Sequence, residues 1–449
     1  MIRLLIIYCL FMWVGFFVVL YMRNELGLPT KGNEEKESVC ARSQLIWIWR
    51  LPVGCDFSGF FVELLGYLPL FREKIDFFAL DSGECHEDFL SILSEKESTA
   101  IKETHRKMDA LKSGKQPNAK TIVIEHSEPC AWSKYLPLQK PDVFIGRTMT
   151  ESWTLDHSWV RCAQRVDELW VPSKWHVEAF KNAGIPEDKL MAIPEAVDTE
   201  FFDPALAKKQ ERHSDDLVLL SVFKWEHRKG WDVLLDAYWS AFTPQDKVVL
   251  KIRSYIPSWE GGLTEMHARV TQYAKMESPN RVKYWREHKG EDTSIPSQLD
   301  ELARIEFLQG GPTIQEGALS RAEMRDLYAS SDVMVLPTRG EGWGLPIVEA
   351  MAMELPVIVT NFSGPTEYLT ESNSYPIGYS MVERHSHMYA EPDFDQLVST
   401  LRHVFANAKD RAAKGKRARQ DMVKRFSPSV VVDQMIDRAN FLLSNKTRI

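Results

Sequence analysis

Two successive series of short apolar runs that alternate with helical patterns constrain the fold of this chain more than any other feature. The first series holds expected strands at 43–52, 121–126 and 142–146 and an apolar helix at 60–71. The second holds expected strands at 217–223, 247–254, 333–337 and 356–360 and expected helices at 231–242, 321–329 and 344–352. Because strands that alternate with helices form βαβ units, each series predicts a parallel sheet covered by helices. The chain is therefore expected to be an α/β protein with two parallel sheets, one after the other along the sequence.

The domain boundaries follow from composition and from helix start signals. A Pro-containing and then charged stretch, 194–215, is the expected linker. Ser320 and Glu323 have the spacing of a capping box, which supports a helix from 321. Ser427 as N-cap and Pro428 at the first helical position predict a last amphipathic helix, which needs a partner surface. The expected units are a first domain at 43–205, a second at 206–426, and a final helix at 427–449 that packs back on the first domain.

A run of nineteen uncharged residues, 4–22, lies between Arg3 and Arg23. At 1.5 Å per residue, a helix of this length just crosses a bilayer core of about 30 Å. A cleaved signal peptide is the alternative, but its apolar region is usually only about 7–15 residues long. We therefore expect a transmembrane signal-anchor at 1–23 and a polar stem at 24–42. We favour a type II protein of the endoplasmic reticulum or Golgi membrane with lumenal catalytic domains, while a cytosolic orientation stays open.

The cysteines exclude two common kinds of site. They are Cys9, Cys40, Cys55, Cys85, Cys130 and Cys162. None belongs to a C-x-x-C pair, so zinc-ribbon and thioredoxin-like interpretations fail on spacing. Five lie outside the expected membrane segment, an odd number that specifies no disulfide framework. Scattered buried thiols with room for one bridge are the favoured interpretation.

The overall charge excludes the whole protein as a nucleic-acid binder. The formal net charge is -8 and the isoelectric point is about 5.9, so no positive field would attract nucleic acid. The basic run at 409–425 is interrupted by Ala and Asp at helical spacing, which favours a solvated helix face. Any binding of phosphate must therefore be local.

One candidate for such a site is the glycine-rich loop at 338–344, which contains Gly340, Gly342 and Gly344 between an expected strand and an expected helix. In an open α/β sheet this junction faces the ligand crevice. Glycines let a ligand approach the backbone, and the N–H groups at a helix N-terminus attract anionic oxygens. Glu341 in the loop and Glu349 on the helix can each accept two neighbouring sugar hydroxyls. Taken alone, the pattern fits a tight turn with a capping acid equally well.

The cationic loop at 224–230 occupies the equivalent place after the first strand of the second series. Lys224, Arg228 and Lys229 lie between that strand and the next helix, where cations can contact a diphosphate. A solvated loop is the alternative for this pattern alone. The two loops on one sheet edge complement each other, since one supplies cations and the other supplies acceptors for hydroxyls.

Three segments that include these loops, 171–204, 217–238 and 319–369, carry a resemblance to a known family. They resemble the retaining glycosyltransferases of GT-B fold called glycosyl transferases group 1, or family 4. The resemblance implies two Rossmann-like domains that face each other across a cleft. The resemblance is strong over 171–369 and extends to the first domain only in outline. Its most specific motif is the pair of glutamates separated by seven residues within GEGWGLPIVEA.

The resemblance implies roles for residues of the second sheet. Glu349 would hold the donor ribose, and Glu341 would hold the transferred sugar. The same sugar would also contact the backbone of Gly342, Trp343, Gly344 and Leu345. Lys224 and Lys229 would hold the diphosphate, with Arg228 beside them. Lys224 stands where the family commonly has Arg, and these side chains are not equivalent at a bidentate site.

The first domain supplies fewer candidates. His126 follows an expected strand where the family often has a histidine that faces the donor, although a lone histidine there is more often structural. Gly54 and Gly59 stand where the family has a glycine-rich acceptor loop, but the typical double glycine is missing. Glu151 is a further candidate for the acceptor side, with a surface acid as the alternative.

The sequence contains one motif that resembles a metal site. Asp393 and Asp395 form a D-x-D string, which binds a divalent metal in the other major glycosyltransferase fold. The string immediately precedes an amphipathic helix, so helix capping explains it better. We therefore expect no metal and no cofactor beyond the nucleoside-diphosphate sugar that serves as co-substrate.

Together these features lead to a hypothesis about function. We expect a metal-independent, retaining hexosyltransferase that uses a UDP- or GDP-linked sugar and a glycan, lipid or protein acceptor. By resemblance, the acceptor hydroxyl attacks from the side of the departing diphosphate. A catalytically silent binding protein of the same fold, a nucleotide-sugar epimerase and a glycosidase remain alternatives, although a cationic loop has no place in glycosidase chemistry.

Overall fold

The structure is a computed structural model that describes most of the chain from residue 45 to residue 446. The described residues are 45–51, 59–83, 85, 90, 93–113, 119–132, 140–208, 215–257, 260, 266–289, 301–310 and 319–446. The predicted signal-anchor and stem, and Gly54, lie outside them. Among the helices within these ranges, none combines the length and the apolar character that a membrane crossing requires.

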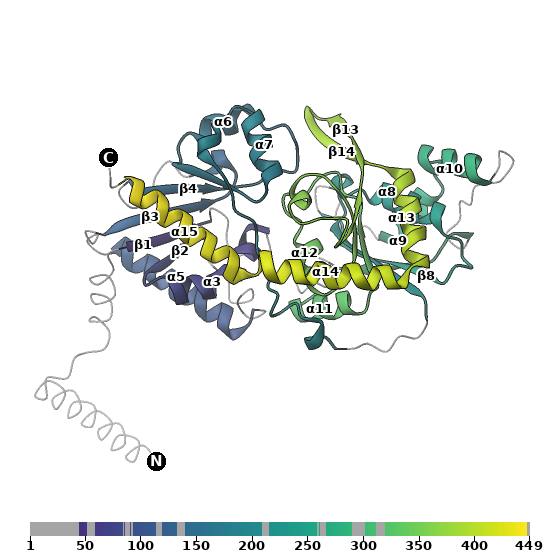
Figure 1. The fold of residues 1–449 in the computed structure, drawn as a ribbon, viewed down its shortest axis with the longest axis horizontal. Coiled ribbons are helices and arrows are strands. Elements are labelled where there is room, and N and C mark those ends of the chain that lie inside the picture. The colour runs from purple at the N-terminus through teal and green to yellow at the C-terminus, as the bar shows by residue number, and fades with distance from the viewer. Residues whose placement is uncertain are drawn as a thin grey trace, which may run out of the picture.

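The first domain is a parallel sheet of six strands in the order β2-β1-β3-β4-β5-β6 (Figure 1). The strands are β1 (Leu45–Arg50), β2 (Phe78–Asp81), β3 (Lys120–His126), β4 (Val143–Arg147), β5 (Glu168–Val171) and β6 (Leu190–Ala192). The helices of this domain are α3 (Gly59–Lys74), α5 (Glu95–Ser113), α6 (His157–Ala163) and α7 (Lys174–Asn182). The expected strands and the expected apolar helix of the first series are thus confirmed.

The second domain is also a parallel sheet of six strands, in the order β12-β11-β10-β7-β8-β9. The strands are β7 (Leu217–Lys224), β8 (Val248–Tyr255), β9 (Ile305–Gln309), β10 (Val333–Leu336), β11 (Val357–Thr360) and β12 (Tyr375–Ile377). The helices are α8 (Trp231–Ala241), α9 (Met266–Ala274), α10 (Pro279–Lys289), α11 (Arg321–Ala329), α12 (Leu345–Ala352) and α13 (Phe394–Ala406). The capping box of Ser320 and Glu323 is present at the start of α11, and the α/β architecture with two parallel sheets is confirmed.

An antiparallel hairpin that the sequence did not predict follows the second sheet. It consists of β13 (Tyr379–Arg384) and β14 (His387–Pro392) and stands between the two domains (Figure 1). His385 and Ser386, which connect the strands, both have positive φ, at 51° and 64°. Such two-residue turns usually contain Asn or Gly, and this one has neither. The usual sequence signal of a hairpin is therefore missing.

Two long helices at the end of the chain run along both domains (Figure 1). Helix α14 (Ala408–Phe426) packs against α12 and α13, and α15 (Pro428–Lys446) packs against α3 and β4. Ser427 has an extended backbone between them, which turns the chain from one domain to the other. Val431 and Met435 of α15 belong to the apolar core of the first domain. The final helix therefore finds its partner surface there.

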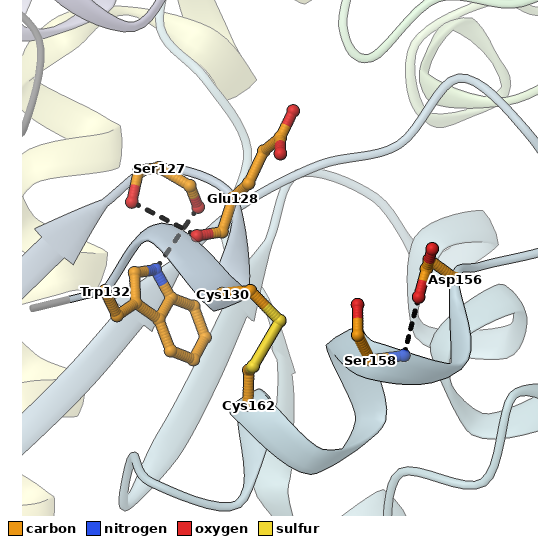
Figure 2. The surroundings of a disulfide bond; sticks show 7 residues. All are labelled: Ser127, Glu128, Cys130, Trp132, Asp156, Ser158 and Cys162. Carbon is orange, nitrogen blue, oxygen red and sulfur yellow. Dashed lines mark hydrogen bonds between the residues drawn. A yellow bond between two sulfur atoms is a disulfide. The ribbon is translucent and has the colours of Figure 1, made fainter. Parts of the chain in front are cut away.

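A disulfide joins Cys130 to Cys162 in the first domain (Figure 2). It links a short 3-10 helix after β3 to α6, with a Cα–Cα distance of 5.2 Å that is usual for a disulfide. Asp156 caps α6 by accepting a hydrogen bond of 2.6 Å from the Ser158 backbone N–H (Figure 2). The cap fixes the start of α6, and the bridge fixes its end.

Candidate active site

The glycine-rich loop and the cationic loop meet at one point of the second sheet. Strands β7 and β10 are neighbours, and the helices that follow them lead to β8 on one side and to β11 on the other. This is the topological switch point, where open α/β sheets leave a crevice at the carboxyl ends of their strands. The Arg339 N–H donates to the Arg228 carbonyl at 2.7 Å, so the two loops are joined by their backbones.

Gly230 permits this close approach. It has a positive φ of 70°, and a Cβ atom at this position would lie only 1.9 Å from the Pro337 carbonyl oxygen. No other residue type fits both conditions without strain. The cationic loop therefore ends in a glycine because the glycine-rich loop lies directly against it.

At the centre of the site Lys229 and Glu341 form an ion pair. Lys229 Nζ donates to both carboxylate oxygens of Glu341 at 2.7 Å, and Thr338 Oγ1 donates to the same carboxylate at 2.9 Å. Burial acts to raise the pKa of Glu341, but the charges of Lys229 and Arg228 outweigh it and hold this pKa below its usual range. Glu341 is therefore ionised, and the sequence-predicted cation and acid contact each other directly.

The other two predicted cations lie in different environments. Arg228 Nη1 donates to the Gly340 carbonyl at 2.6 Å, and its Nη2 lies 3.4 Å from Glu151 and 3.3 Å from Glu226. Lys224 is the last residue of β7 and is exposed. Arg228 thus belongs to the same polar cluster as Lys229, whereas Lys224 is exposed at the carboxyl end of β7.

The predicted backbone contacts follow directly after Glu341. Gly344 has a positive φ of 93° and is the N-cap of α12, which begins at Leu345. The Trp343 side chain is buried against Tyr368, and the Trp343 carbonyl accepts a hydrogen bond of 2.7 Å from the Tyr368 hydroxyl. Trp343 therefore offers a ligand its backbone rather than its ring. Gly342 lies one residue before it, at the start of this turn into the helix.

Glu349 lies on α12, four residues after Leu345, the first residue of the helix. Its Oε2 accepts a hydrogen bond of 2.8 Å from the Tyr328 hydroxyl on α11. Burial raises the pKa of Glu349 to about 7, although Tyr328 and the charge of Arg321 act in the opposite direction. The protonation state of this carboxyl is therefore sensitive to pH near neutrality.

The structure corrects the expectation that His126 is open to the donor. Its side chain has no exposed surface and packs edge-on against Trp49 and Phe60, with ring centroids 5.6 and 4.7 Å away. Its Nε2 lies 3.2 Å from Glu63. Burial, and after it the charge of Arg147, lowers the pKa of His126 well below its usual value, so the ring is neutral. His126 lies in the interior of the first domain.

Two of the three acceptor-side candidates, Gly59 and Glu151, lie in the described part of the chain. Gly59 is the first residue of α3, and Gly54 lies outside the described residues. Glu151 belongs to the junction segment, residues 149–154, which follows β4 and touches the second domain. A Cβ atom on Gly340 would lie 2.1 Å from the Glu151 carbonyl oxygen. Glu151 therefore lies beside the cationic and glycine-rich loops.

Sequence reasoning missed several residues that shape this site. Ser363 Oγ accepts a hydrogen bond of 2.8 Å from the Glu341 backbone N–H, and Tyr328 is bonded to Glu349. Arg339 is buried, with ionic partners on two other elements. A short loop after β11 could have suggested Ser363, but no local signal identifies the partners of Arg339, which lie 107 and 52 residues away.

The D-x-D string has a structural role. Asp393 Oδ1 accepts a hydrogen bond of 3.0 Å from the Gln396 backbone N–H and caps α13. Among the residues that the structure describes, no group of three or more His, Cys, Asp or Glu side chains is arranged to hold a metal ion. The capping interpretation of Asp393 is thus confirmed.

Comparison with known proteins gives matches in the second domain and over the whole fold. Residues 290–405 match the model of the family glycosyl transferases group 1. The sulfoquinovosyl transferase SQD2 of Arabidopsis thaliana is 30% identical over 145 residues, and the match covers 29% of this chain and 27% of SQD2. The chain thus spans only about a quarter of the length of this relative.

Solved structures resemble the chain over most of its length. HepE of Anabaena, solved in complex with UDP and glucose, has a TM-score of 0.59 and 13% identity, and the match covers 88% of this chain and 99% of HepE. A glycosyltransferase from Rickettsia africae has a TM-score of 0.57 and 16% identity, with 90% and 100% covered. The sucrose-phosphate synthase of Thermosynechococcus elongatus has a TM-score of 0.56 and 15% identity, again with 90% and 100% covered. Residues 290–405 therefore resemble the glycosyl transferases group 1, and the fold of the whole chain, with its two parallel sheets, is similar to that of solved GT-B glycosyltransferases.

Proposed function

We propose that this protein is a metal-independent, retaining glycosyltransferase that moves a hexose from a nucleoside-diphosphate sugar to a hydroxyl of a glycan, lipid or protein. The observation that carries the proposal is the ion pair of Lys229 with Glu341 beside the N-terminus of α12. It joins a cation suited to a diphosphate with an acid suited to sugar hydroxyls. Both side chains are largely buried, at 14% and 7% exposed, so water screens their charges little.

In this proposal the chain stabilises the charge that develops on the leaving diphosphate. Lys229, Arg228 and the positive end of α12 bind its oxygens, and Lys224 contributes from the solvent edge. Each such preorganised donor is typically worth about 3–4 kcal/mol in the transition state. Glu341 orients the sugar, and Glu349 accepts the ribose hydroxyls. The acceptor hydroxyl attacks from the diphosphate side, and a leaving phosphate oxygen takes its proton.

A uracil nucleotide is the first donor to test. The Anabaena protein HepE, whose fold resembles this chain, was solved with UDP and glucose. At 13% identity HepE does not specify the nucleotide base that this chain binds, so GDP-sugars belong in the same panel.

We further propose that the protein resides in the membrane of the endoplasmic reticulum or Golgi, with its catalytic domains in the lumen. The uncharged run at 4–22 supports an anchor. The disulfide between Cys130 and Cys162 supports an oxidising compartment, since such bonds are rare in the cytosol. A thiol-alkylation assay on the protein from its native membrane tests this, and free thiols at both positions would contradict a lumenal site.

The donor panel tests the proposed activity. The purified chain is mixed with UDP- and GDP-sugars, with and without EDTA, and binding and slow hydrolysis are measured. The anomer of the first-formed product is followed by NMR. We expect one nucleotide series to bind, turnover that survives EDTA, and retention at the anomeric carbon. Binding without turnover would indicate a silent binding protein, and conversion of the sugar without release of nucleotide would indicate an epimerase.

A matched pair of lysine variants makes the panel specific. Lys229→Ala removes the proposed diphosphate contact, whereas Lys181→Ala removes an exposed lysine that pairs with Glu187 in the first domain. Loss of turnover in the first variant alone supports the proposed site. Equal turnover in both variants would contradict it.

A further inference from the structure

The guanidinium of Arg339 is fully paired although it lies inside the glycine-rich loop. Its Nη1 and Nη2 donate to the two oxygens of Asp232 at 2.7 and 2.8 Å, and its Nε and Nη2 donate to the two oxygens of Glu391 at 2.9 and 2.8 Å. Nη1 also donates to the His227 carbonyl at 2.8 Å. A guanidinium has five N–H groups, and here all five are used. The side chain is only 3% exposed.

The partners of Arg339 belong to three different elements. His227 lies in the cationic loop, Asp232 lies in the first turn of α8, and Glu391 lies on strand β14 of the hairpin. The backbone of Arg339 repeats this pattern. Its N–H donates to the Arg228 carbonyl at 2.7 Å, and its carbonyl accepts from the Ala390 N–H at 3.0 Å. Arg339 therefore joins the cationic loop to the hairpin by both side chain and backbone.

The same hairpin contacts the first domain through the junction segment. The Met388 carbonyl accepts a hydrogen bond of 2.9 Å from the Trp153 N–H, and the Met388 N–H donates to Thr154 Oγ1 at 3.0 Å. Ser152 Oγ also donates to the Met388 carbonyl, at 3.1 Å. In Figure 1 the hairpin stands between the two domains, as these contacts require. A continuous path of hydrogen bonds thus runs from the cationic loop through Arg339 and β14 to the first domain.

We propose that Arg339 is a positioning residue that couples the conformation of the cationic loop to the docking of the hairpin on the junction segment. The proposal rests on the proposed function in one respect, since it takes the cationic loop as the site of the diphosphate. A buried ion pair contributes little net stability compared with an apolar replacement. The geometry of the Arg339 ion pairs instead fixes the relative positions of the cationic loop, α8 and β14. Binding of a nucleotide to the loop and docking of the domains should therefore strengthen each other, and by linkage the two effects are equal in free energy.

The planar fork of arginine is essential to this role. Lysine keeps the positive charge but has only three N–H donors on one atom and cannot bind two carboxylates side by side. Arg339→Lys therefore preserves the charge and removes the geometry. Arg402→Lys is the matched control, because Arg402 also donates to a carboxylate, that of Asp246 at 3.2 Å, but is 48% exposed and lies on α13.

The experiment uses the full chain and two readouts. Hydrogen exchange of peptides that contain Trp153 is measured without nucleotide, and the dissociation constants of UDP and GDP are measured by calorimetry. We expect Arg339→Lys to accelerate exchange at Trp153 and to weaken the better nucleotide at least about fivefold, the lower end of typical coupling between sites. The Arg402→Lys control should stay within about twofold of wild type. Unchanged exchange at Trp153 in Arg339→Lys would overturn the proposal.

A second variant keeps the proposal testable if Arg339→Lys does not fold. Thr154→Val removes the side-chain hydrogen bond to Met388 from the first-domain side, far from the guanidinium. Coupling predicts that it too weakens nucleotide binding, and wild-type affinity in this variant would contradict coupling. If the wild-type chain binds neither UDP nor GDP, the proposed function fails on its own. The exchange readout at Trp153 then still decides whether Arg339 controls the docking of the hairpin.

Discussion

Lys229 Nζ lies 2.7 Å from both carboxylate oxygens of Glu341. The cation expected to hold a diphosphate and the acid expected to hold a sugar are therefore already bound to each other at the switch point of the second sheet. Each fixes the position of the other, and Thr338 and Ser363 fix Glu341 further. A site in this state is preorganised, which is the main way in which enzymes stabilise developing charge.

Lys229→Ala should lower turnover by about 10²–10³, the usual effect of removing one preorganised donor from a charged transition state. The change is measured as kcat at saturating donor. Because the variant also leaves Glu341 buried without its cation, some loss of stability is expected as well. A variant that keeps the wild-type kcat would exclude Lys229 from the proposed diphosphate site.

Glu341→Gln should separate the sugar from the nucleotide. The variant loses a charged acceptor for sugar hydroxyls and frees Lys229 from a competing carboxylate, so it should bind the free nucleoside diphosphate as well as wild type or more tightly. Its affinity for the nucleotide sugar should fall by about tenfold, which corresponds to one charge-assisted hydrogen bond. Calorimetry with both ligands measures the two effects. Equal loss of both affinities would indicate that Glu341 only supports the fold.

The affinity for nucleotide should rise with pH near neutrality because of Glu349. Burial raises the pKa of this carboxyl to about 7, and the ionised form is the better acceptor for ribose hydroxyls. Protons and nucleotide therefore compete, and the affinity should increase as the pH rises from 6 to 8. Tyr328→Phe removes the hydrogen bond that lowers this pKa and should move the midpoint to higher pH. A pH-independent affinity would contradict the role of Glu349.

The raised pKa of Glu349 also makes the stability of the folded protein depend on pH. A carboxyl whose pKa is raised on folding contributes stability that is present below its unfolded pKa, near 4.5, and is lost as the pH rises through about 7. Glu349→Gln does not titrate, so relative to wild type it should gain about 1–3 kcal/mol of unfolding free energy between pH 5 and pH 8. Denaturant titrations at the two pH values measure this gain. A constant difference would mean that the pKa is not raised.

The sequence predicted the elements whose signal is local. Strand β7 and helix α12 carry apolar runs of the right length and period, and the cap at Ser320 has its own spacing. The positions of Lys229 and Glu341 follow from this, since parallel strands of one sheet bring their carboxyl ends to one edge. Two strands and the loops that follow them were therefore enough to predict that Lys229 and Glu341 lie close together.

Features that depend on distant parts of the chain could not be predicted. His126 is buried because Trp49 and Phe60 close around it, and neither is a neighbour in sequence. The hairpin turn at His385 lacks the residues that usually mark such turns. The pairing of Arg339 with Asp232 spans 107 residues. In each case the environment is made by tertiary packing, which a local pattern does not contain.

A side chain in place of Gly342 should disturb the contact between the junction segment and the glycine-rich loop less than a side chain in place of Gly340. A Cβ atom on Gly340 would lie 2.1 Å from a backbone oxygen of Glu151, whereas on Gly342 it would meet the Sδ atom of Met149 at 2.2 Å. Backbone cannot move away easily, but the end of a methionine side chain can. Gly340→Ala should therefore reduce nucleotide affinity and thermal stability more than Gly342→Ala. The opposite order would show that the two domains do not meet as described.

Removal of the disulfide should destabilise the first domain while leaving the nucleotide site intact. Cys130 and Cys162 are separated by 32 positions (Figure 2), and closing a loop of this length restricts the unfolded chain by about 3–4 kcal/mol in the loop-entropy model. The bridge connects η1 (Pro129–Ala131) to α6, both far in sequence from Lys229 and Glu341. The double variant Cys130→Ala/Cys162→Ala should therefore unfold at lower denaturant than wild type, and its affinity for nucleotide at low temperature should not change. The single variant Cys162→Ala is the matched control, because it removes the same bond and leaves Cys130 in place. Agreement of the two curves would assign the loss to the bond itself, whereas a wild-type midpoint in both would show that the bridge does not restrain the fold.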